Sequence, residues 1–175
     1  YVYGFATEDI ASSLETFIPS AAQTPGRMNI FDFKDYKVMI DFAHNPDGFR
    51  GIKEFLSTID STYKIGIITG TGDRRDEDIR DMGRISAEMF DHIIIRQDKF
   101  LRGRQAEDIV RLLVEGIVNV DPMKSHEYVP KEIDALNHAF SIAKSGSFIV
   151  ALSDVIDNAI EVVHGHLEKE RAVGV

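Results

Sequence analysis

The sequence has 175 residues, about the size of one domain, and 43% of them are hydrophobic, which is enough to form a core without disulfides. The net charge of −9 makes nucleic acids and anionic membranes poor partners, and no apolar run is long enough to cross a bilayer. The absence of Cys excludes disulfides and thiolate sites, and together with the lack of a secretory leader it favours the cytoplasm.

The first part of the chain differs in pattern from the rest. Apolar side chains at helical spacing predict a helix from Thr7 to Phe17, and Pro19 ends it. Residues 29–33 and 37–42 are short extended runs joined by a turn, which predicts a β-hairpin.

From residue 38 onward, short β-branched runs alternate with amphipathic segments. The predicted strands are 38–40, 65–68, 93–95, 126–129 and 148–152, and the predicted helices are 47–59, 76–90, 106–118, 131–144 and 154–168. Continuous apolar strands are typical of a parallel sheet covered on both faces. We therefore expect an α/β, Rossmann-like, doubly wound and mostly parallel sheet of about six strands. It would have one antiparallel edge strand and helices on both faces.

Ligands of such sheets bind beyond the carboxyl ends of the strands, so the loops there are candidate sites. The first loop contains Asp41, His44 and Asn45. A carboxylate can accept hydrogen bonds from two sugar hydroxyls, His and Asn supply directional donors, and a helix N-terminus attracts anions. The same residues could instead form only an Asx turn and a helix cap, with Asp47 as another possible cap.

The second loop, residues 69–74, contains two glycines followed by Asp73 and Arg74. Glycine lets backbone N–H groups approach a ligand closely. The third glycine of a dinucleotide-binding fingerprint is missing, so a dinucleotide-dependent oxidoreductase is not favoured. Residues 75–84 are expected to form a solvated charged helix face, with pairs such as Asp76 with Arg80.

The third loop carries four cations within residues 96–104, in a chain that is acidic overall. Arg binds carboxylate and phosphate bidentately, so an anion site is one interpretation of this loop and a solvated surface loop is the other. Ser153 and Asp154 are expected to cap the last helix. No metal site is expected, because His92, His126 and His138 are isolated in sequence and His164 with His166 has no third ligand.

Three motifs, in this order, carry a resemblance to a known family. They are Thr24-Pro25-Gly26-Arg27, Asp41-Phe42-Ala43-His44-Asn45-Pro46 and Gly70-Thr71-Gly72-Asp73-Arg74. Together they resemble the C-terminal domain of the Mur ligase family, over roughly residues 7–155. The longer sequences of residues 23–29, 72–80 and 98–104 are most similar to members of this family that join arginine to the β-carboxyl of aspartate in a polymer.

The resemblance implies a fold, a reaction and partners. It identifies residues 1–22 as a remnant of an upstream central domain or linker, and residues 23–175 as the amino-acid-binding domain that closes over ATP. A central domain with a P-loop would bind ATP and Mg²⁺ and form an acyl phosphate, which the amine of arginine then attacks. The sequence has no P-loop motif, so this chain alone is expected to be inactive.

The resemblance also implies residue roles. Arg27, Asp41, His44 and Asn45 would contact the nucleotide. Amino-acid binding would fall to Asp73, Arg74, Asp98, Arg102 and Arg104, with the acidic partner of arginine inferred from charge matching alone. No catalytic residue or metal ligand is expected within the domain, and an oligomer is possible. The alternative is a stand-alone Rossmann-like or flavodoxin-like binding module without catalysis.

Overall fold

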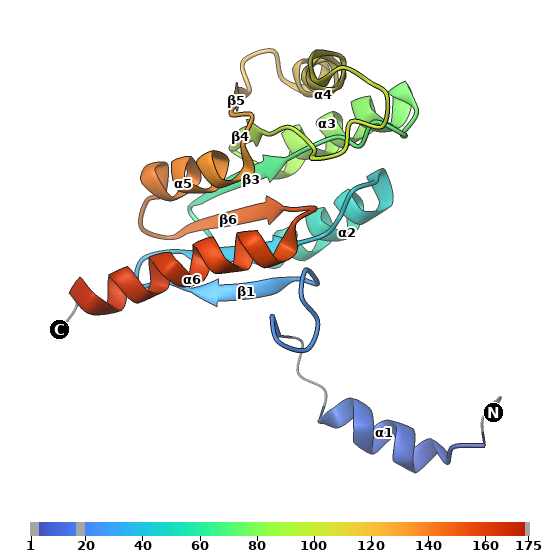
Figure 1. Ribbon diagram of the computed structural model, residues 1–175, viewed down its shortest axis with the longest axis vertical. Coiled ribbons are helices and arrows are strands. Elements are labelled where there is room, and N and C mark those ends of the chain that lie inside the picture. The colour runs from blue at the N-terminus through green and yellow to red at the C-terminus, as the bar shows by residue number, and fades with distance from the viewer. Residues whose placement is uncertain (1–3, 17–19, 174–175) are drawn as a thin grey trace.

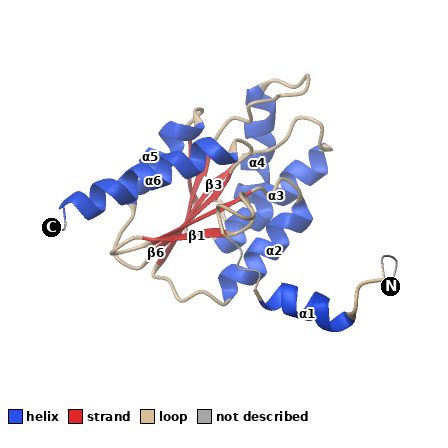
Figure 2. Ribbon diagram, turned by 60° about the horizontal axis from the view of Figure 1, so that its bottom comes forward, coloured by secondary structure: helices blue, strands red, loops and turns tan. Residues whose placement is uncertain are grey.

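The computed structural model describes residues 4–16 and 20–173 and places a six-stranded sheet between two layers of helices (Figures 1 and 2). The strand order is β1-β2-β6-β3-β4-β5, with β1 antiparallel to β2 and every other pair parallel. The strands are β1 (Asn29–Asp32), β2 (Lys37–Asp41), β3 (Tyr63–Ile68), β4 (His92–Ile95), β5 (Ser125–Tyr128) and β6 (Ser147–Leu152). The predicted fold class, including the antiparallel edge strand, is confirmed.

Alternate strand residues point to opposite faces of the sheet and build two cores. In β2, Met39 packs with the helices of one face, while Val38 and Ile40 pack with those of the other. The first face is covered by α2 (Pro46–Ser57), α3 (Asp76–Met89) and α4 (Ala106–Val120), and the second by α5 (Glu132–Ile142) and α6 (Ile156–Val173).

The chain reverses direction across the sheet, and this reversal creates a crevice. From β2 it proceeds through β3 and β4 to β5, and α5 then returns it so that β6 lies between β2 and β3. The registers Asp41↔Leu152 and Ile68↔Ile95 bring the carboxyl ends of these parallel strands to one edge. The three candidate loops therefore meet where such sheets bind their ligands.

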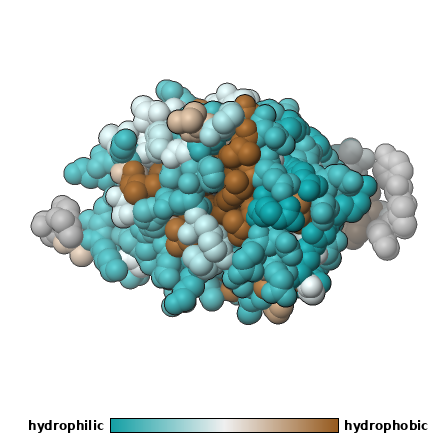
Figure 3. Space-filling model, turned by 90° about the horizontal axis from the view of Figure 1, so that it is seen from above, coloured by the Kyte–Doolittle hydropathy of each residue, from teal (hydrophilic) through white to brown (hydrophobic). Residues whose placement is uncertain are grey.

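The first helix, α1 (Thr7–Glu15), stands apart from the sheet (Figure 1) and buries none of its residues. It ends before the predicted Phe17, which lies outside the described residues. The face seen in Figure 3 is mostly hydrophilic, with hydrophobic side chains confined to narrow areas. Across residues 4–16 and 20–173, no helix has the length and apolar character needed to span a membrane.

Candidate functional site

A cavity of about 210 Å³ opens at the carboxyl edge of the sheet, and four loops contribute to its wall. Four of the predicted site residues line it, namely His44, Arg74, Asp98 and Arg102. The other lining residues are Phe42, Ala43, Thr69, Thr71, Arg96, Phe100, Leu152, Ser153 and Asp154. The lining thus combines three arginines with two aspartates, which suits a ligand carrying anionic groups beside a cationic one.

Arg27 lies next to this cavity on a turn that Asn29 holds in place. The buried Asn29 side chain accepts from the Gly26 N–H (2.7 Å) and donates to the Thr24 carbonyl (2.9 Å). Gly26 has a φ of 73°, a left-handed conformation in which glycine is unstrained. The exposed Arg27 guanidinium lies 5.6 Å from the ring centre of Phe42, a cavity-lining residue. Arg27 is therefore at the margin of the cavity rather than in its wall.

Asp41 is nearly buried, at 8% exposure, and both its carboxylate oxygens accept backbone hydrogen bonds. The Met28 N–H donates to one oxygen (2.9 Å) and the Ala43 N–H to the other (2.7 Å). Asp41 thereby ties the Arg27 turn to the end of β2. The predicted contact with ribose remains a prediction, because Asp41 is not among the residues that line the cavity.

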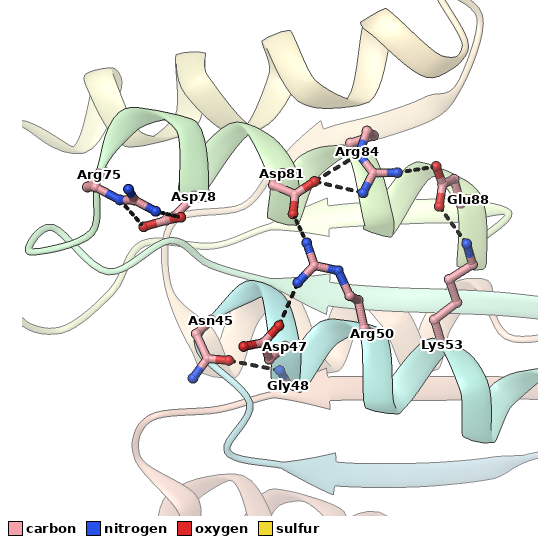
Figure 4. Close-up of polar contacts among 10 residues, drawn as sticks. All are labelled: Asn45, Asp47, Gly48, Arg50, Lys53, Arg75, Asp78, Asp81, Arg84 and Glu88. Atoms are coloured by element: carbon pink, nitrogen blue, oxygen red, sulfur yellow. Dashed lines mark hydrogen bonds and ion pairs between the residues drawn. The ribbon is translucent and has the colours of Figure 1, made fainter.

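His44 and Asn45 follow on the loop before α2. The His44 Nδ1–H donates to the Phe42 carbonyl oxygen (3.0 Å), which turns Nε2 into the ring nitrogen available to a ligand. Asn45 is the N-cap of α2, because its side-chain oxygen accepts from the Gly48 N–H at 2.8 Å (Figure 4). Asn45 therefore caps the helix, which is the alternative role that the sequence allowed for this loop. Asp47, the other possible cap, forms an ion pair with Arg50 at 2.6 Å.

Arg104, in the loop after β4, holds the loop after β3 in place. Its guanidinium donates to the carbonyl oxygens of Gly72 (2.9 Å) and Arg74 (2.8 Å), and it forms an ion pair with Asp76 (2.6 Å). A Cβ at Gly72 would overlap the Leu101 carbonyl oxygen, so only glycine allows the two loops to touch. Asp76 therefore pairs with Arg104 rather than with the expected Arg80, which instead pairs with Glu115 at 2.7 Å.

Three residues that line the cavity each hold a buried polar atom without a hydrogen-bond partner in the described part of the chain. Among the described residues, none offers a hydrogen bond to Thr69 Oγ1, Thr71 Oγ1 or Arg74 Nε. Arg102, which adopts a φ of 50°, forms an ion pair with Asp73 at the cavity margin. Because an unpaired buried polar atom costs free energy, these three atoms indicate a cavity built for a polar ligand or ordered water.

Arg96 is the most buried charge of the site, at 2% exposure, and acidic residues surround it. It forms an ion pair with Asp154 (2.5 Å), lies 3.6 Å from Glu132 and donates to the Leu152 carbonyl (3.0 Å). Burial raises the pKa of Glu132, although Arg96 and a hydrogen bond from Ser153 act against it. Burial likewise raises the pKa of Asp98, against a hydrogen bond from the Phe100 N–H.

A second hollow of about 500 Å³ adjoins the cavity and shares Arg96, Asp98 and Asp154 with it. Glu132 and Asp134 add two more carboxylates to its wall, beside Lys99 and Lys131. Four carboxylates against three cations make this the more acidic of the two spaces. A ligand that extends from the cavity into the hollow would meet arginines first and carboxylates second.

Sequence reasoning did not select Arg96 and Asp154 as site residues. Each lies within two positions of the end of a strand that finishes in a run of apolar residues, and such a position is a usable signal for a buried charge at a strand edge. Asp154 was interpreted as a helix cap. Its side chain instead pairs with Arg96, and α6 begins at Ile156.

Comparison with known proteins adds an independent line of evidence. The family model described as "Mur ligase, glutamate ligase domain" matches residues 26–155. Cyanophycin synthetase of Geminocystis herdmanii is 37% identical over 97% of this chain and 20% of its own length. UDP-N-acetylmuramyl-tripeptide synthetase of Treponema pallidum is 28% identical over 79% of this chain and 26% of its own length. The chain thus spans about a fifth to a quarter of these relatives.

Solved structures share the fold at lower sequence identity. Escherichia coli FolC in complex with DHPP and ADP superposes with a TM-score of 0.69 at 18% identity, over 93% of this chain and 36% of that one. Mycobacterium tuberculosis folylpolyglutamate synthase complexed with ADP and AMPPCP gives 0.68, also at 18% identity and with the same coverage of both chains. These likenesses establish the architecture.

Proposed function

Because the chain belongs to the Mur ligase family through its glutamate ligase domain, we propose that it is the C-terminal domain of an ATP-dependent amide ligase. Arginine is the amino acid we propose it adds, at the β-carboxyl of aspartate in a polymer, as the resemblance of residues 23–29, 72–80 and 98–104 implies. Residues 23–175 would form the domain and residues 1–22 the link to an upstream central domain with the P-loop. The proposal places the enzyme in the cytoplasm, where ATP is supplied.

One observation carries this proposal: three residues that line an arginine-rich cavity at the sheet reversal each hold a buried polar atom without a hydrogen-bond partner among the described residues. A cavity of that kind gains binding energy only when a ligand supplies the missing partners. Phosphate and carboxylate oxygens accept from a guanidinium and from hydroxyl groups, and both are present in an acyl-phosphate reaction.

The proposed reaction has two steps. A polymer carboxylate oxygen attacks the γ-phosphorus of ATP, and ADP leaves. The arginine amine then attacks the acyl carbon and loses a proton as inorganic phosphate leaves. Positioning supplies most of the rate in such a sequence, so this domain would act by orienting its ligands. We assign the holding of Mg²⁺ to the central domain and not to residues of this chain.

The nucleotide would be held by the first loop and its neighbouring turn. We propose that the Arg27 guanidinium donates to phosphate oxygens, and that His44 Nε2, which carries no proton in this tautomer, accepts from an N–H or O–H group of the nucleotide. Asn45 would position the start of α2, and Asp41 would fix the Arg27 turn in addition to any contact with ribose.

The incoming amino acid would be held by the other two loops. We propose that Arg74 binds its α-carboxylate, and that Asp98 at the border of the acidic hollow receives its guanidinium. Arg102 with Asp73 would close the margin, and Arg104 would keep the loop after β3 in place.

The test is arginine incorporation by the full-length ligase. His44→Ala should lower incorporation by about tenfold or more at unchanged thermal stability, because a positioning contact is lost. His126→Ala is the matched control, since its Nδ1 also bonds a carbonyl two residues earlier (2.8 Å) but lies on the distant strand β5. Full activity of His44→Ala would contradict the nucleotide site.

A second substitution separates the amino-acid site from the nucleotide site. Asp98→Asn should reduce the preference for arginine over citrulline, its uncharged analogue, and leave the KM for ATP unchanged. An unchanged preference would contradict the role of Asp98. Failure of the ligase to join arginine to polymer at all would instead favour the stand-alone binding module.

A further inference from the structure

A cluster of two histidines and one glutamate lies far from the cavity, at the opposite edge of the sheet. His92 begins β4, Glu127 lies in β5 and His138 lies in α5. His92 pairs in register with Ser125, the first residue of β5, so the cluster is at the amino ends of these strands. Residues that are isolated in sequence are thus brought together by the parallel pairing of β4 with β5 and by the packing of α5.

The geometry points to a Zn²⁺-binding site formed by His92, Glu127 and His138, and we propose that this chain binds one such ion there. The Nε2 atoms of the two histidines each lie 2.7 Å from the same Glu127 oxygen. One candidate ligand atom from each residue lies within 4.8 Å of the other two. This spacing allows a single ion to reach all three at the bond lengths of about 2.0–2.2 Å that Zn²⁺ takes with nitrogen and oxygen.

The orientation of one ring favours a metal ligand. His92 is held at both nitrogens, since Nδ1 lies 2.7 Å from Ser125 Oγ while Nε2 faces Glu127. When Nε2 binds a metal, Nδ1 carries the ring proton and donates it to the Ser125 hydroxyl. A partner of this kind on the far nitrogen fixes the tautomer of metal-binding histidines.

The surroundings suit an ion with a water ligand. The side chains of Glu127 and His138 are 37% and 35% exposed, so a hydrated ion can enter and keep one water in the fourth position. Two imidazoles with one carboxylate is a ligand set that Zn²⁺ uses when it retains an open position, and imidazole disfavours Mg²⁺ and Ca²⁺. The ion would replace the hydrogen bonds among the three side chains and fasten the edge strand β5 to α5.

The test is titration of the purified 175-residue chain with ZnSO₄, followed by calorimetry and thermal unfolding. One Zn²⁺ per chain should bind and raise the unfolding temperature, because an ion bound to the folded state stabilises it. His138→Gln and Glu127→Gln should each weaken binding by about tenfold or more. Glu127→Gln keeps the shape of the side chain, so it separates lost ligation from lost folding.

Matched controls lie next to the cluster and elsewhere on the surface. His126→Gln alters the residue between Ser125 and Glu127 on the opposite face of β5, and His164→Gln alters a histidine on α6. Both should leave Zn²⁺ binding unchanged. Co²⁺ bound to the wild-type chain should give the intense visible absorption of a four-coordinate site. Absence of Zn²⁺ binding, or equal binding by wild type and Glu127→Gln, would overturn the proposal.

Discussion

At the scale of single residues, the site depends most on Arg96. Its guanidinium is buried and lies beside Asp154 and Glu132, and it also donates to the Leu152 carbonyl at the end of β6. A buried charge that loses its partner is far more costly than a pair that was never formed. Arg96 therefore allows Asp98 and Asp154 to share the border between the cavity and the hollow, with Glu132 beside them in the hollow.

We predict that Arg96→Leu lowers the free energy of unfolding by about 3–5 kcal/mol, because it leaves buried carboxylates without compensation. Urea denaturation of the purified chain measures this loss. Arg111→Leu is the control, since Arg111 forms exposed pairs on α4 and should leave the midpoint nearly unchanged. Equal midpoints for the two variants would show that Arg96 is not a central support of the site.

The raised pKa of Glu132 predicts how the stability of the folded protein changes with pH. Burial raises its pKa above the ordinary value of 4.5, so the folded protein holds this proton more tightly than the unfolded chain does. Its contribution to stability therefore falls as pH rises from 4.5 through the raised pKa. Glu132→Gln cannot titrate, so its stability relative to wild type should increase with pH across that window.

Chemical denaturation of both proteins at several pH values between 4 and 7 measures this difference. Substitution also removes a negative charge that interacts with Asp98 and Asp154, and that change acts in the same direction. A relative stability that stays constant or decreases with pH would contradict a raised pKa.

At the scale of elements, most of the fold follows from local patterns. Runs such as Ile93-Ile94-Ile95 are buried on both faces, and only an interior parallel strand explains such a run. The helix that follows each of the strands from β2 to β6 then fixes the α/β class. The strand order, in contrast, could not be predicted from local patterns, because no feature of Ser147–Leu152 indicates that β6 lies between β2 and β3.

The candidate site was predictable in part for the same reason. Loops after parallel strands meet at one edge, so His44, Arg74, Asp98 and Arg102 could be placed together from sequence. Pairings between elements could not be predicted, because they depend on spacing across helices and loops. Arg104 reaches Asp76 from another loop, and His138 reaches the Glu127 oxygen that His92 contacts only through the position of α5.

Helices α2 and α3 are joined by a chain of ion pairs (Figure 4). Arg50 contacts Asp81 of the facing helix, Arg84 contacts both Asp81 and Glu88 (2.7 and 2.5 Å), and Lys53 returns to Glu88 (2.5 Å). The charges alternate along the chain of contacts, so each inner residue has two partners. This network helps to fix the start of α2, which carries the candidate nucleotide loop.

Glu88 provides the test at this scale. A hydrogen bond from Lys53, aided by Arg84, holds the pKa of Glu88 below its ordinary value despite some burial. Its stabilisation is therefore present above pH 4.5 and lost as pH falls through the lowered pKa. Glu88→Gln should cost about 0.5–1 kcal/mol at pH 7 and progressively less in acid, as measured by urea denaturation. A cost that grows in acid would contradict the network.

At the scale of the whole molecule, the charge near the cavity differs in sign from the net charge of the chain. The chain carries a net charge of −9, yet three arginines line the cavity and Arg27 lies at its margin. In a chain that is acidic overall, this group of arginines makes the cavity more favourable to anions than the average surface. We interpret this as the surface of a domain that closes on a nucleotide held mainly by a neighbour.

A domain that needs a neighbour to hold ATP should have no activity of its own when purified. The sequence contains no P-loop motif, and the lining of the cavity supplies arginines and hydroxyls. Incubated with ATP, Mg²⁺, arginine and an aspartate polymer, the chain should release no phosphate above the buffer rate, while the full-length ligase should release one phosphate per arginine added. Phosphate release by the isolated chain that His44→Ala abolishes would show that the domain is a complete enzyme. It would then need its own phosphate-binding residues, and Arg27, Arg74 and Arg102 would be the first to substitute.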